Sequence, residues 1–250
     1  MKEWEDLSDW YDKKQGEGGD LWHRALIDPV LLRLIGDPRD GEILDLGSGN
    51  GYLSRRLARE GGMITAVDSS LRMIENARSH DPSNSLKITY LHLDANRLDP
   101  IGGESFDLIF ANMSLMDMED GEESIREVGR VLRKGGRFVA SICHPCFDNG
   151  SNSAWVVEKV LFETRVYRRI RAYRMPFAED IPWRTESGEK RYTPSFHRPL
   201  SWYARVFHTS GLAITALEEP EPTAEFLEKG SNGKEFLEVP LHLVFEAIKL

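Results

Sequence analysis

The fold is decided by residues 42–57, which read EILDLGSGNGYLSRRL. Ile43, Leu44 and Leu46 form an apolar run of strand length, and three glycines then interrupt the pattern. After the glycines, apolar side chains recur at helical spacing between charged ones, which predicts an amphipathic helix. Alternate glycines allow positive φ and a close approach of the backbone to a ligand, and the free N–H groups at the start of the helix face the same point. The stretch therefore predicts a site for a nucleotide-type ligand.

Length and composition indicate a soluble globular protein. The chain has 250 residues, enough for one domain or for a domain with an insertion, and 40% of them are hydrophobic and 29% charged. The sequence has no apolar stretch of the roughly 20 residues needed to span a bilayer. The first residues, MKEWEDLSDWYDKK, are too acidic and polar for a signal peptide. We therefore expect a cytoplasmic protein that does not enter a membrane.

The charge and the cysteines exclude further classes. With 32 basic and 41 acidic side chains the net charge is −9, which argues against a general binder of nucleic-acid backbones. A small or locally recognised partner is favoured instead. Cys143 and Cys146 form a single CxxC within ICHPCF, a weak zinc signal without a second pair. We therefore expect no metal, and no disulfide in the cytosol.

Strands and helices alternate through the following hundred residues. Strands are predicted at 63–67, 88–93, 106–111 and 137–142, with helices between them, the last of these over 122–132 and closed by Gly135 and Gly136. This pattern predicts a doubly wound, mostly parallel α/β sheet that binds ligands at the carboxyl ends of its strands. Asp68 ends the second strand 21 residues after Gly47, the interval at which a carboxylate can accept hydrogen bonds from ribose hydroxyls.

Two segments depart from the alternation. Residues 1–36 look helical around the loop GEGGD, and we expect an N-terminal helical lid because such a segment commonly lies across the open end of the sheet. Residues 149–195 are rich in β-formers, arginine and aromatic residues, which predicts an inserted strand-rich cap and suggests a planar or anionic ligand. The main domain would then comprise 37–148 and 196–250, the latter with a helix and two final strands.

The motifs ILDLGSGNG, AVDSS, LDAN, FDLIFANMSLMD and VLRKGGRF occur in this order. Together they resemble the class I S-adenosylmethionine-dependent methyltransferases over residues 40–142 and again in the terminal helix and strand pair. In detail the chain looks like the small-molecule branch of ubiquinone and menaquinone biosynthesis, the methyltransferase type 11-like branch. A dinucleotide fingerprint would require a glycine at position 52, where Tyr52 stands. The resemblance implies S-adenosylmethionine as cofactor and a Rossmann-like, seven-stranded sheet in the order 3-2-1-4-5-7-6 with an antiparallel last pair.

The resemblance also implies roles for individual residues. Asp45 would lie near the methionine moiety of the cofactor, Asp68 would hold the ribose hydroxyls, and Asp94 would accept a hydrogen bond from the adenine amino group. Asn112 and Met113 would approach the region of methyl transfer. The full set of expected cofactor-binding residues is Tyr11, Asp45, Gly47, Ser48, Gly49, Gly51, Asp68, Ser69, Met73, Asp94, Ala95, Asn96, Asn112 and Met113.

Methyl transfer from a sulfonium depends mostly on positioning and on exclusion of water. A base is needed only if the acceptor must lose a proton, and His144, just after the fifth strand, is the candidate because imidazole titrates near neutral pH. A His-Pro turn residue bonded to backbone is the alternative. Arg198 could clamp a carboxylate or phosphate, or form a structural salt bridge. The expected substrate-contacting residues are Trp22, His23, Met116, His197 and Arg198.

Three functions remain open. The first is methylation of an O, N or C atom of a small molecule. The second is methylation of RNA or protein, which the basic insertion permits and the overall acidity disfavours. NMSLMD stands where an Asn-Pro-Pro-Tyr-like sequence would indicate methylation of DNA base amines. The third is a regulatory module that binds S-adenosylmethionine without catalysis. The acceptor and the oligomeric state stay undetermined.

Overall fold

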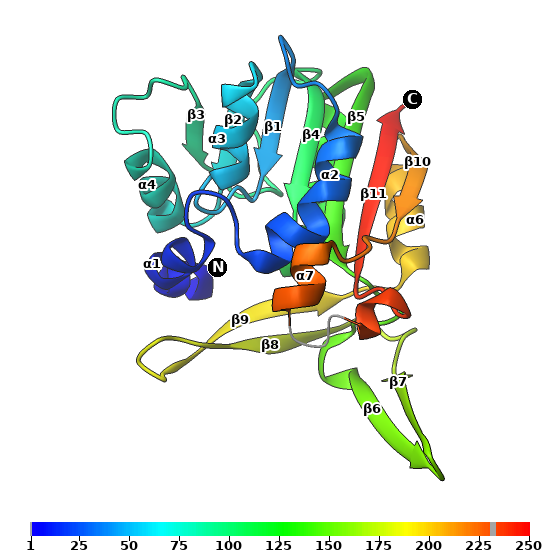
Figure 1. The fold of residues 1–250 in the computed structure, drawn as a ribbon. Helices are drawn as coiled ribbons and strands as arrows, with labels where there is room; N and C mark the ends of the chain where they lie inside the picture. Colours follow the sequence, from blue (N-terminus) through cyan, green and yellow to red (C-terminus); the bar gives the residue numbers. More distant parts are fainter. Residues whose placement is uncertain (1, 231–233) are drawn as a thin grey trace.

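The computed structural model describes residues 2–230 and 234–250 and is built on one seven-stranded sheet (Figure 1). The strand order is β10-β11-β5-β4-β1-β2-β3, with β11 antiparallel to both β5 and β10 and the other pairs parallel. The predicted α/β class, the mostly parallel sheet and its order are confirmed. The strands are β1 (Glu42–Leu46), β2 (Met63–Asp68), β3 (Thr89–His92), β4 (Phe106–Asn112), β5 (Leu132–Cys143), β10 (Leu212–Glu218) and β11 (His242–Lys249).

Helices cover both faces of the sheet. Successive residues of a strand point to opposite faces, so Ile43 packs with α2, α3 and α4 while Leu44 packs with α5 and α6. Both side chains are buried, as expected for a parallel strand covered on two sides. Among the described residues, no helix is long and apolar enough to cross a membrane. The helices are α1 (Lys2–Gln15), α2 (Asp28–Ile35), α3 (Tyr52–Arg59), α4 (Leu71–Ser79), α5 (Gly121–Val131), α6 (Leu200–Thr209) and α7 (Ala224–Lys229).

The fifth strand begins earlier than the sequence predicts. β5 follows α5 directly at Leu132, which pairs with Phe106, and the register shifts before the next pair, Leu108 with Arg137. The glycines expected to close the helix therefore lie inside the strand. Gly135 has φ +75°, a conformation that suits glycine at an irregular point of the ladder. The predicted start at residue 137 was wrong because a bulge preserves the pairing where the glycines suggested a loop.

The N-terminal segment divides into two parts. α2 packs on the sheet, and its Leu31 and Ile35 are fully buried in the main core. α1 instead lies beside α4 and on β9, away from the centre of the sheet. A short π-helical turn, His23–Ile27, joins the two parts. Of the predicted lid, only the region of α1 is therefore placed to cover the edge of the sheet.

The insertion forms two hairpins with separate positions (Figure 1). In the first, β6 (Ser153–Val160) pairs with β7 (Glu163–Ile170), and this hairpin projects from the molecule with Phe162 fully exposed at its turn. In the second, β8 (Phe177–Arg184) pairs with β9 (Lys190–His197) and lies under α1. The strand-rich character of the insertion matches the prediction, and only the second hairpin reaches α1.

The contact between α5 and α6 requires a glycine. A Cβ at Gly129 would lie 2.3 Å from the backbone oxygen of Ser210, so Gly129→Ala forces the two helices apart. Although alanine favours helix formation, we expect the variant to lose about 1–3 kcal/mol in free energy of unfolding, the usual cost of overpacking. Urea unfolding measures this loss. Gly18→Ala is the control, since its Cβ would meet open space; equal stability of the two variants would contradict the predicted clash.

Candidate active site

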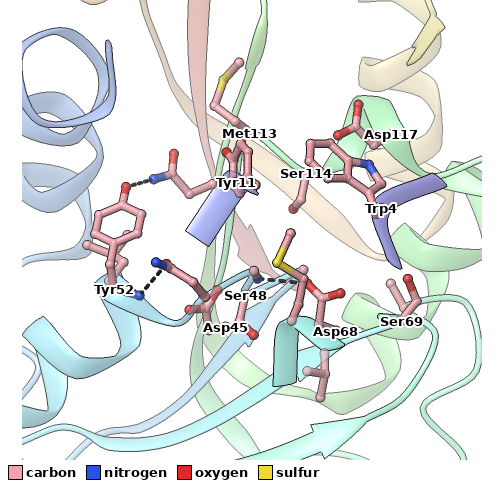
Figure 2. A pocket seen from close by; sticks show the side chains of 18 of the residues that line it. Trp4, Tyr11, Asp45, Ser48, Tyr52, Asp68, Ser69, Met113, Ser114 and Asp117 are labelled. Carbon is pink, nitrogen blue, oxygen red and sulfur yellow. Dashed lines mark hydrogen bonds between the residues drawn. The ribbon is translucent and has the colours of Figure 1, made fainter. Parts of the chain in front are cut away.

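A cleft opens at the carboxyl ends of β1, β2 and β4 (Figure 2). This is the location at which open α/β sheets bind ligands. It is lined by Trp4, Tyr11, Gln15, His23, Asp45, Gly47, Ser48, Gly49, Asn50, Tyr52, Leu53, Val67, Asp68, Ser69, Met73, Leu93, Ala95, Asn112, Met113, Ser114, Asp117 and Met118.

The glycine turn shapes the floor of this cleft. Gly47 has φ +75°, and a Cβ there would lie 2.6 Å from the Cβ of Ser114, so both the conformation and the space require glycine. Gly49 has φ +53° with open space where a Cβ would stand. The Oγ of Ser48 is buried and has no hydrogen-bond partner among the described residues. A ligand can therefore approach the backbone closely and satisfy this hydroxyl.

Carboxyl groups, of which Asp45 is buried and Asp68 and Asp117 are half-buried, dominate the charge of the cleft. The carboxylate of Asp68 accepts hydrogen bonds from the N–H groups of Gly49 (2.8 Å) and Ser70 (2.9 Å), while burial raises the pKa of Asp68. Burial raises the pKa of Asp45 to about 7, and the Asp68 charge adds to this. Burial also raises the pKa of Asp117 well above its usual value. Lys and Arg are absent from the lining within the described chain, so the cleft favours a ligand that carries positive charge.

Tyr52 stands at the centre of a hydrogen-bond network. Its hydroxyl donates to the Asp28 carboxylate (3.0 Å) and accepts from the Asn112 side-chain amide (2.8 Å). The Asn112 amide oxygen accepts in turn from the Ser141 hydroxyl (2.6 Å). Tyr52 thus joins α3 to α2 and β4. It stands where a dinucleotide fingerprint has its third glycine. Sequence reasoning used Tyr52 only to exclude that fingerprint and missed its place in the cleft wall.

α1 is held over the cleft by polar contacts to α4. Glu5 accepts from the Ser70 hydroxyl (2.6 Å), Asp9 pairs with the Arg72 guanidinium (2.7 Å), and Asp12 pairs with His80 (2.7 Å). Through this attachment Trp4 and Tyr11 of α1 line the cleft (Figure 2). Trp4 was missed as a site residue, although the sequence places it on the same face of the helix as Tyr11.

Most of the residues expected to bind a cofactor line this cleft, and three do not. Gly51 stands behind the wall, where a Cβ would lie 3.0 Å from the Tyr90 hydroxyl. Asp94 is exposed, and its carboxylate accepts from the Asn96 N–H (3.3 Å). Neither Asp94 nor Asn96 belongs to the lining, so the expected contact with an adenine amino group has no support in this structure. Residues that sequence reasoning missed are Trp4, Gln15, Asn50, Tyr52, Leu53, Val67, Leu93, Ser114, Asp117 and Met118.

A second cleft adjoins the first, between α1, the segment after β5 and the β8–β9 hairpin. The residues that line both clefts are Trp4, Tyr11, His23, Met113 and Asp117. Those that line only the second are Met116, Cys143, Pro145, Asp148, Asn149, Gly150, Glu179, Ile181, Trp183, Thr193, Ser195, Phe196, His197, Arg198 and Tyr203. The two clefts are therefore adjoining and share part of their walls.

Four of the five expected substrate-contacting residues line the second cleft. Trp22 is the exception, since its ring packs against Phe226 and Phe236. Arg198 forms no salt bridge with a described residue, and its contact with a carboxylate or phosphate stays a prediction. Its buried guanidinium donates to the backbone oxygens of Met118 (2.6 Å) and Glu119 (2.8 Å) and so holds the segment that carries Asp117.

His144 lines neither cleft and is 2% exposed. Its Nδ1 accepts from the Cys146 N–H (3.1 Å), and its Nε2 lies 3.1 Å from the Glu219 carboxylate. Burial lowers the pKa of the His144 imidazole. With both nitrogens occupied, His144 is a turn residue here, and its position gives no support to the predicted role as a base. The described part of the chain contains no cluster of metal-ligating side chains.

Comparison with known proteins identifies the type of domain. Residues 44–140 match the family model of a methyltransferase domain. The chain is 30% identical over 132 residues to the ubiquinone biosynthesis O-methyltransferase of Coxiella burnetii (strain RSA 493 / Nine Mile phase I), covering 49% of this chain and 56% of the relative. It is 32% identical over 111 residues to the malonyl-[acyl-carrier protein] O-methyltransferase of Hamiltonella defensa, covering 44% and 41%. The chain thus spans about half the length of the curated relatives it matches.

Two solved structures are similar over most of the chain. An S-adenosylmethionine-dependent methyltransferase from Mesorhizobium loti superposes with a TM-score of 0.73 at 26% identity, covering 88% of this chain and 96% of the other. A structure described as a putative S-adenosylmethionine-dependent methyltransferase from Listeria monocytogenes superposes with a TM-score of 0.72 at 21% identity, covering 89% and 96%, which supports the fold.

Asp45 should make stability depend on pH. Burial raises the pKa of its carboxyl to about 7 in the folded protein, whereas the exposed group of the unfolded chain has its ordinary pKa of 3.8. The folded state therefore binds more protons in this interval, and stability falls as pH rises, by at most about 1.4 kcal/mol per pH unit. Compared with Asp45→Asn, the wild-type protein should lose more free energy of unfolding between pH 5 and 7. Asp99→Asn at an exposed carboxyl is the control; parallel curves for all three proteins would contradict this role of Asp45.

Arg72 should control the position of α1. Arg72→Ala removes the pairing with Asp9, so we expect faster amide hydrogen exchange in α1 and about threefold weaker binding of S-adenosylhomocysteine, a modest effect because the pair is exposed. Arg97→Ala, which removes an exposed pairing with Asp99, is the matched control. If exchange in α1 is the same in both variants, the attachment does not depend on Arg72.

Proposed function

We propose that this chain, which carries a class I S-adenosylmethionine-dependent methyltransferase domain, transfers a methyl group from S-adenosylmethionine to a small-molecule acceptor. The observation that carries the proposal is the pair of adjoining clefts, one at the carboxyl edge of the sheet and one under the inserted hairpin. The first suits a cationic nucleoside-type cofactor, and the second offers a separate chamber for the acceptor.

The residues of the first cleft fit the cofactor. Asp68 still has acceptor capacity for ribose hydroxyls, because its two N–H contacts leave lone pairs unused. The unpartnered hydroxyl of Ser48 and the open space at Gly49 allow close polar contact with the ligand. Asp45 and Asp117 complement a sulfonium and an ammonium group. When bound, the cofactor supplies an electrophilic methyl group.

The chain contributes position and exclusion of water. α1 and the β8–β9 hairpin enclose the space in which the two reactants meet, and Met113 and Asp117 line both clefts there. Met113 has φ +54°, an uncommon conformation for this residue type, and its N–H donates to the Ser141 hydroxyl (2.9 Å). Alignment of two reactants accounts for a large part of the rate of such displacements.

The relatives support a small acceptor without identifying it. They are named as O-methyltransferases of ubiquinone biosynthesis and of a malonyl-carrier protein, so their acceptors differ. Methylation of RNA is disfavoured because the second cleft contains three carboxyl groups, from Asp117, Asp148 and Glu179, which repel phosphates. A protein acceptor and a regulatory module without catalysis are the remaining alternatives, and labelled methyl transfer separates them from the proposal.

Cofactor binding is the direct test. We expect S-adenosylhomocysteine to bind in calorimetry and Asp68→Ala to bind it at least about tenfold more weakly, because the ribose would lose a charged acceptor. Asp99→Ala, at an exposed carboxyl outside both clefts, should bind as the wild-type protein does. Incubating the wild-type protein with methyl-labelled cofactor and a metabolite pool should then yield a labelled small molecule. No binding, or label found only in protein or RNA, would refute the proposal.

A further inference from the structure

The charge of the second cleft disfavours an anionic ligand, although the arginine-rich insertion suggested one. The lining contains the carboxyl groups of Asp117, Asp148 and Glu179. Asp148 pairs with Arg168 (3.0 Å). Within the described chain, neither Asp117 nor Glu179 has a basic side chain within 4.0 Å. Two of the three carboxyl groups therefore lack a cationic partner of their own.

The basic side chains around the cleft are already occupied. The guanidinium of Arg198 is directed at the backbone oxygens of residues 118 and 119. The Arg168 guanidinium lies over the Trp155 ring and donates to the Phe147 oxygen (2.7 Å) besides pairing with Asp148. The His197 Nε2 lies 2.8 Å from the Tyr173 backbone oxygen. An anionic acceptor would find no free guanidinium in the described lining.

The walls of the cleft are aromatic. The ring of Trp183 lies 5.9 Å from that of Trp4 and 6.0 Å from that of Tyr11, so three lining rings from α1 and β8 form one cluster. The ammonium of Lys14 lies 4.8 Å from the centre of the Trp183 ring, and its charge is balanced by Asp20 (3.0 Å). Aromatic faces attract cations, and they do so more strongly where water is excluded. The cluster thus suits an organic cation as well as an apolar group.

Asp117 marks the point where the two clefts meet, because it lines both. It ends a short 3-10 turn, Leu115–Asp117, that Arg198 holds through the adjacent backbone oxygens. Figure 2 shows its carboxyl beside the Trp4 indole. A reacting atom bound at this junction would lie between the acceptor chamber and the cofactor cleft.

We propose that the acceptor is a small amine, that Asp117 binds its nitrogen at the junction and takes its proton, and that Glu179 and the aromatic cluster stabilise its positive charge. The inference rests on the proposed methyl transfer and specifies its substrate class. The ammonium first gives a proton to Asp117. The freed nitrogen lone pair then forms the new bond to the methyl carbon while the carbon–sulfur bond breaks and its electron pair goes to sulfur. A methylated secondary or tertiary ammonium and neutral S-adenosylhomocysteine result, and the proton held by Asp117 leaves to solvent.

Binding gives the first test, independent of turnover. We would titrate the protein saturated with S-adenosylhomocysteine with phenethylamine, tyramine and tryptamine, each beside the alcohol and the carboxylate of the same skeleton, and follow tryptophan fluorescence. At least one amine should bind about tenfold or more tightly than its two analogues, because a carboxylate pairs with an ammonium only. Equal binding of an alcohol or a carboxylate, or no amine binding by the cofactor-loaded protein, would overturn the inference.

Two isosteric variants locate the contact. Asp117→Asn and Glu179→Gln should each weaken binding of the best amine about tenfold or more. S-adenosylhomocysteine should bind Glu179→Gln as it binds the wild-type protein, since Glu179 does not line the first cleft. Asp99→Asn should change neither affinity. Amine binding that is insensitive to both substitutions would contradict the assigned contacts.

The pH profile distinguishes a proton acceptor from a structural carboxyl. In the wild-type protein kcat/KM for the amine should fall at low pH as Asp117 gains its proton, and Asp117→Asn should lower kcat on the order of 10²-fold and remove this limb. The groups that face Asp117 are Asp68, Tyr11, Cys143 and Tyr203. Burial raises the pKa of the two phenols and of the thiol, so they do not titrate on the acid side.

The two proposals fail in different ways. If S-adenosylhomocysteine does not bind, the proposed function itself is wrong. If it binds and the labelled product of a metabolite pool is an ether, an ester or a carbon-methylated compound, the methyltransferase stands and the amine class is refuted. A labelled amine, lost in Asp117→Asn but retained in Asp99→Asn, supports both.

Discussion

The contacts of the Asp68 carboxylate are the constraint on which the rest of the site depends. One oxygen accepts the N–H of Gly49 from the turn after β1, and the other accepts the N–H of Ser70 at the start of α4. A single side chain at the end of β2 thus fixes both loops that form the floor of the first cleft. Burial opposes its ionisation, so these hydrogen bonds, and a ligand that completes them, stabilise the charged form.

The same region also fixes the roof of the site. The N–H of Ser70 donates to Asp68, and the hydroxyl of Ser70 donates to Glu5 of α1. Arg72 pairs with Asp9, which lies one turn beyond Glu5 in α1. Cofactor cleft and covering helix are therefore attached to one another through α4. Motion of α1 would open both clefts at once, since Trp4 and Tyr11 belong to both linings.

The charge of the second cleft differs from the charge of the inserted segment that helps to form it. The insertion is rich in arginine, but the Arg165 side chain pairs with Glu163 on the exposed β7, and Arg168 is bound to Asp148. Arg198, close to the reaction chamber, holds backbone oxygens near Asp117. The carboxyl groups therefore determine the charge inside the second cleft. Composition described the segment correctly, but the arginines that it counts do not supply the lining of the second cleft, where Asp117, Asp148 and Glu179 stand.

The sequence by itself determined the alternation of strands and helices and the glycine turn, because apolar periodicity and glycine placement act within a few residues. The strand order came from the resemblance to a known family. It also placed Asp45 and Asp68 at strand ends, where they line the cleft. Only the tertiary structure decided which groups share the site. Glu5 meets Ser70 across 65 residues, and Tyr52 meets Asn112 across 60. The tertiary structure also places His144 beside Glu219, 75 residues away, and Asp117 at the junction of the two clefts. Such contacts depend on how layers pack, and local patterns hold no information about partners so distant along the chain.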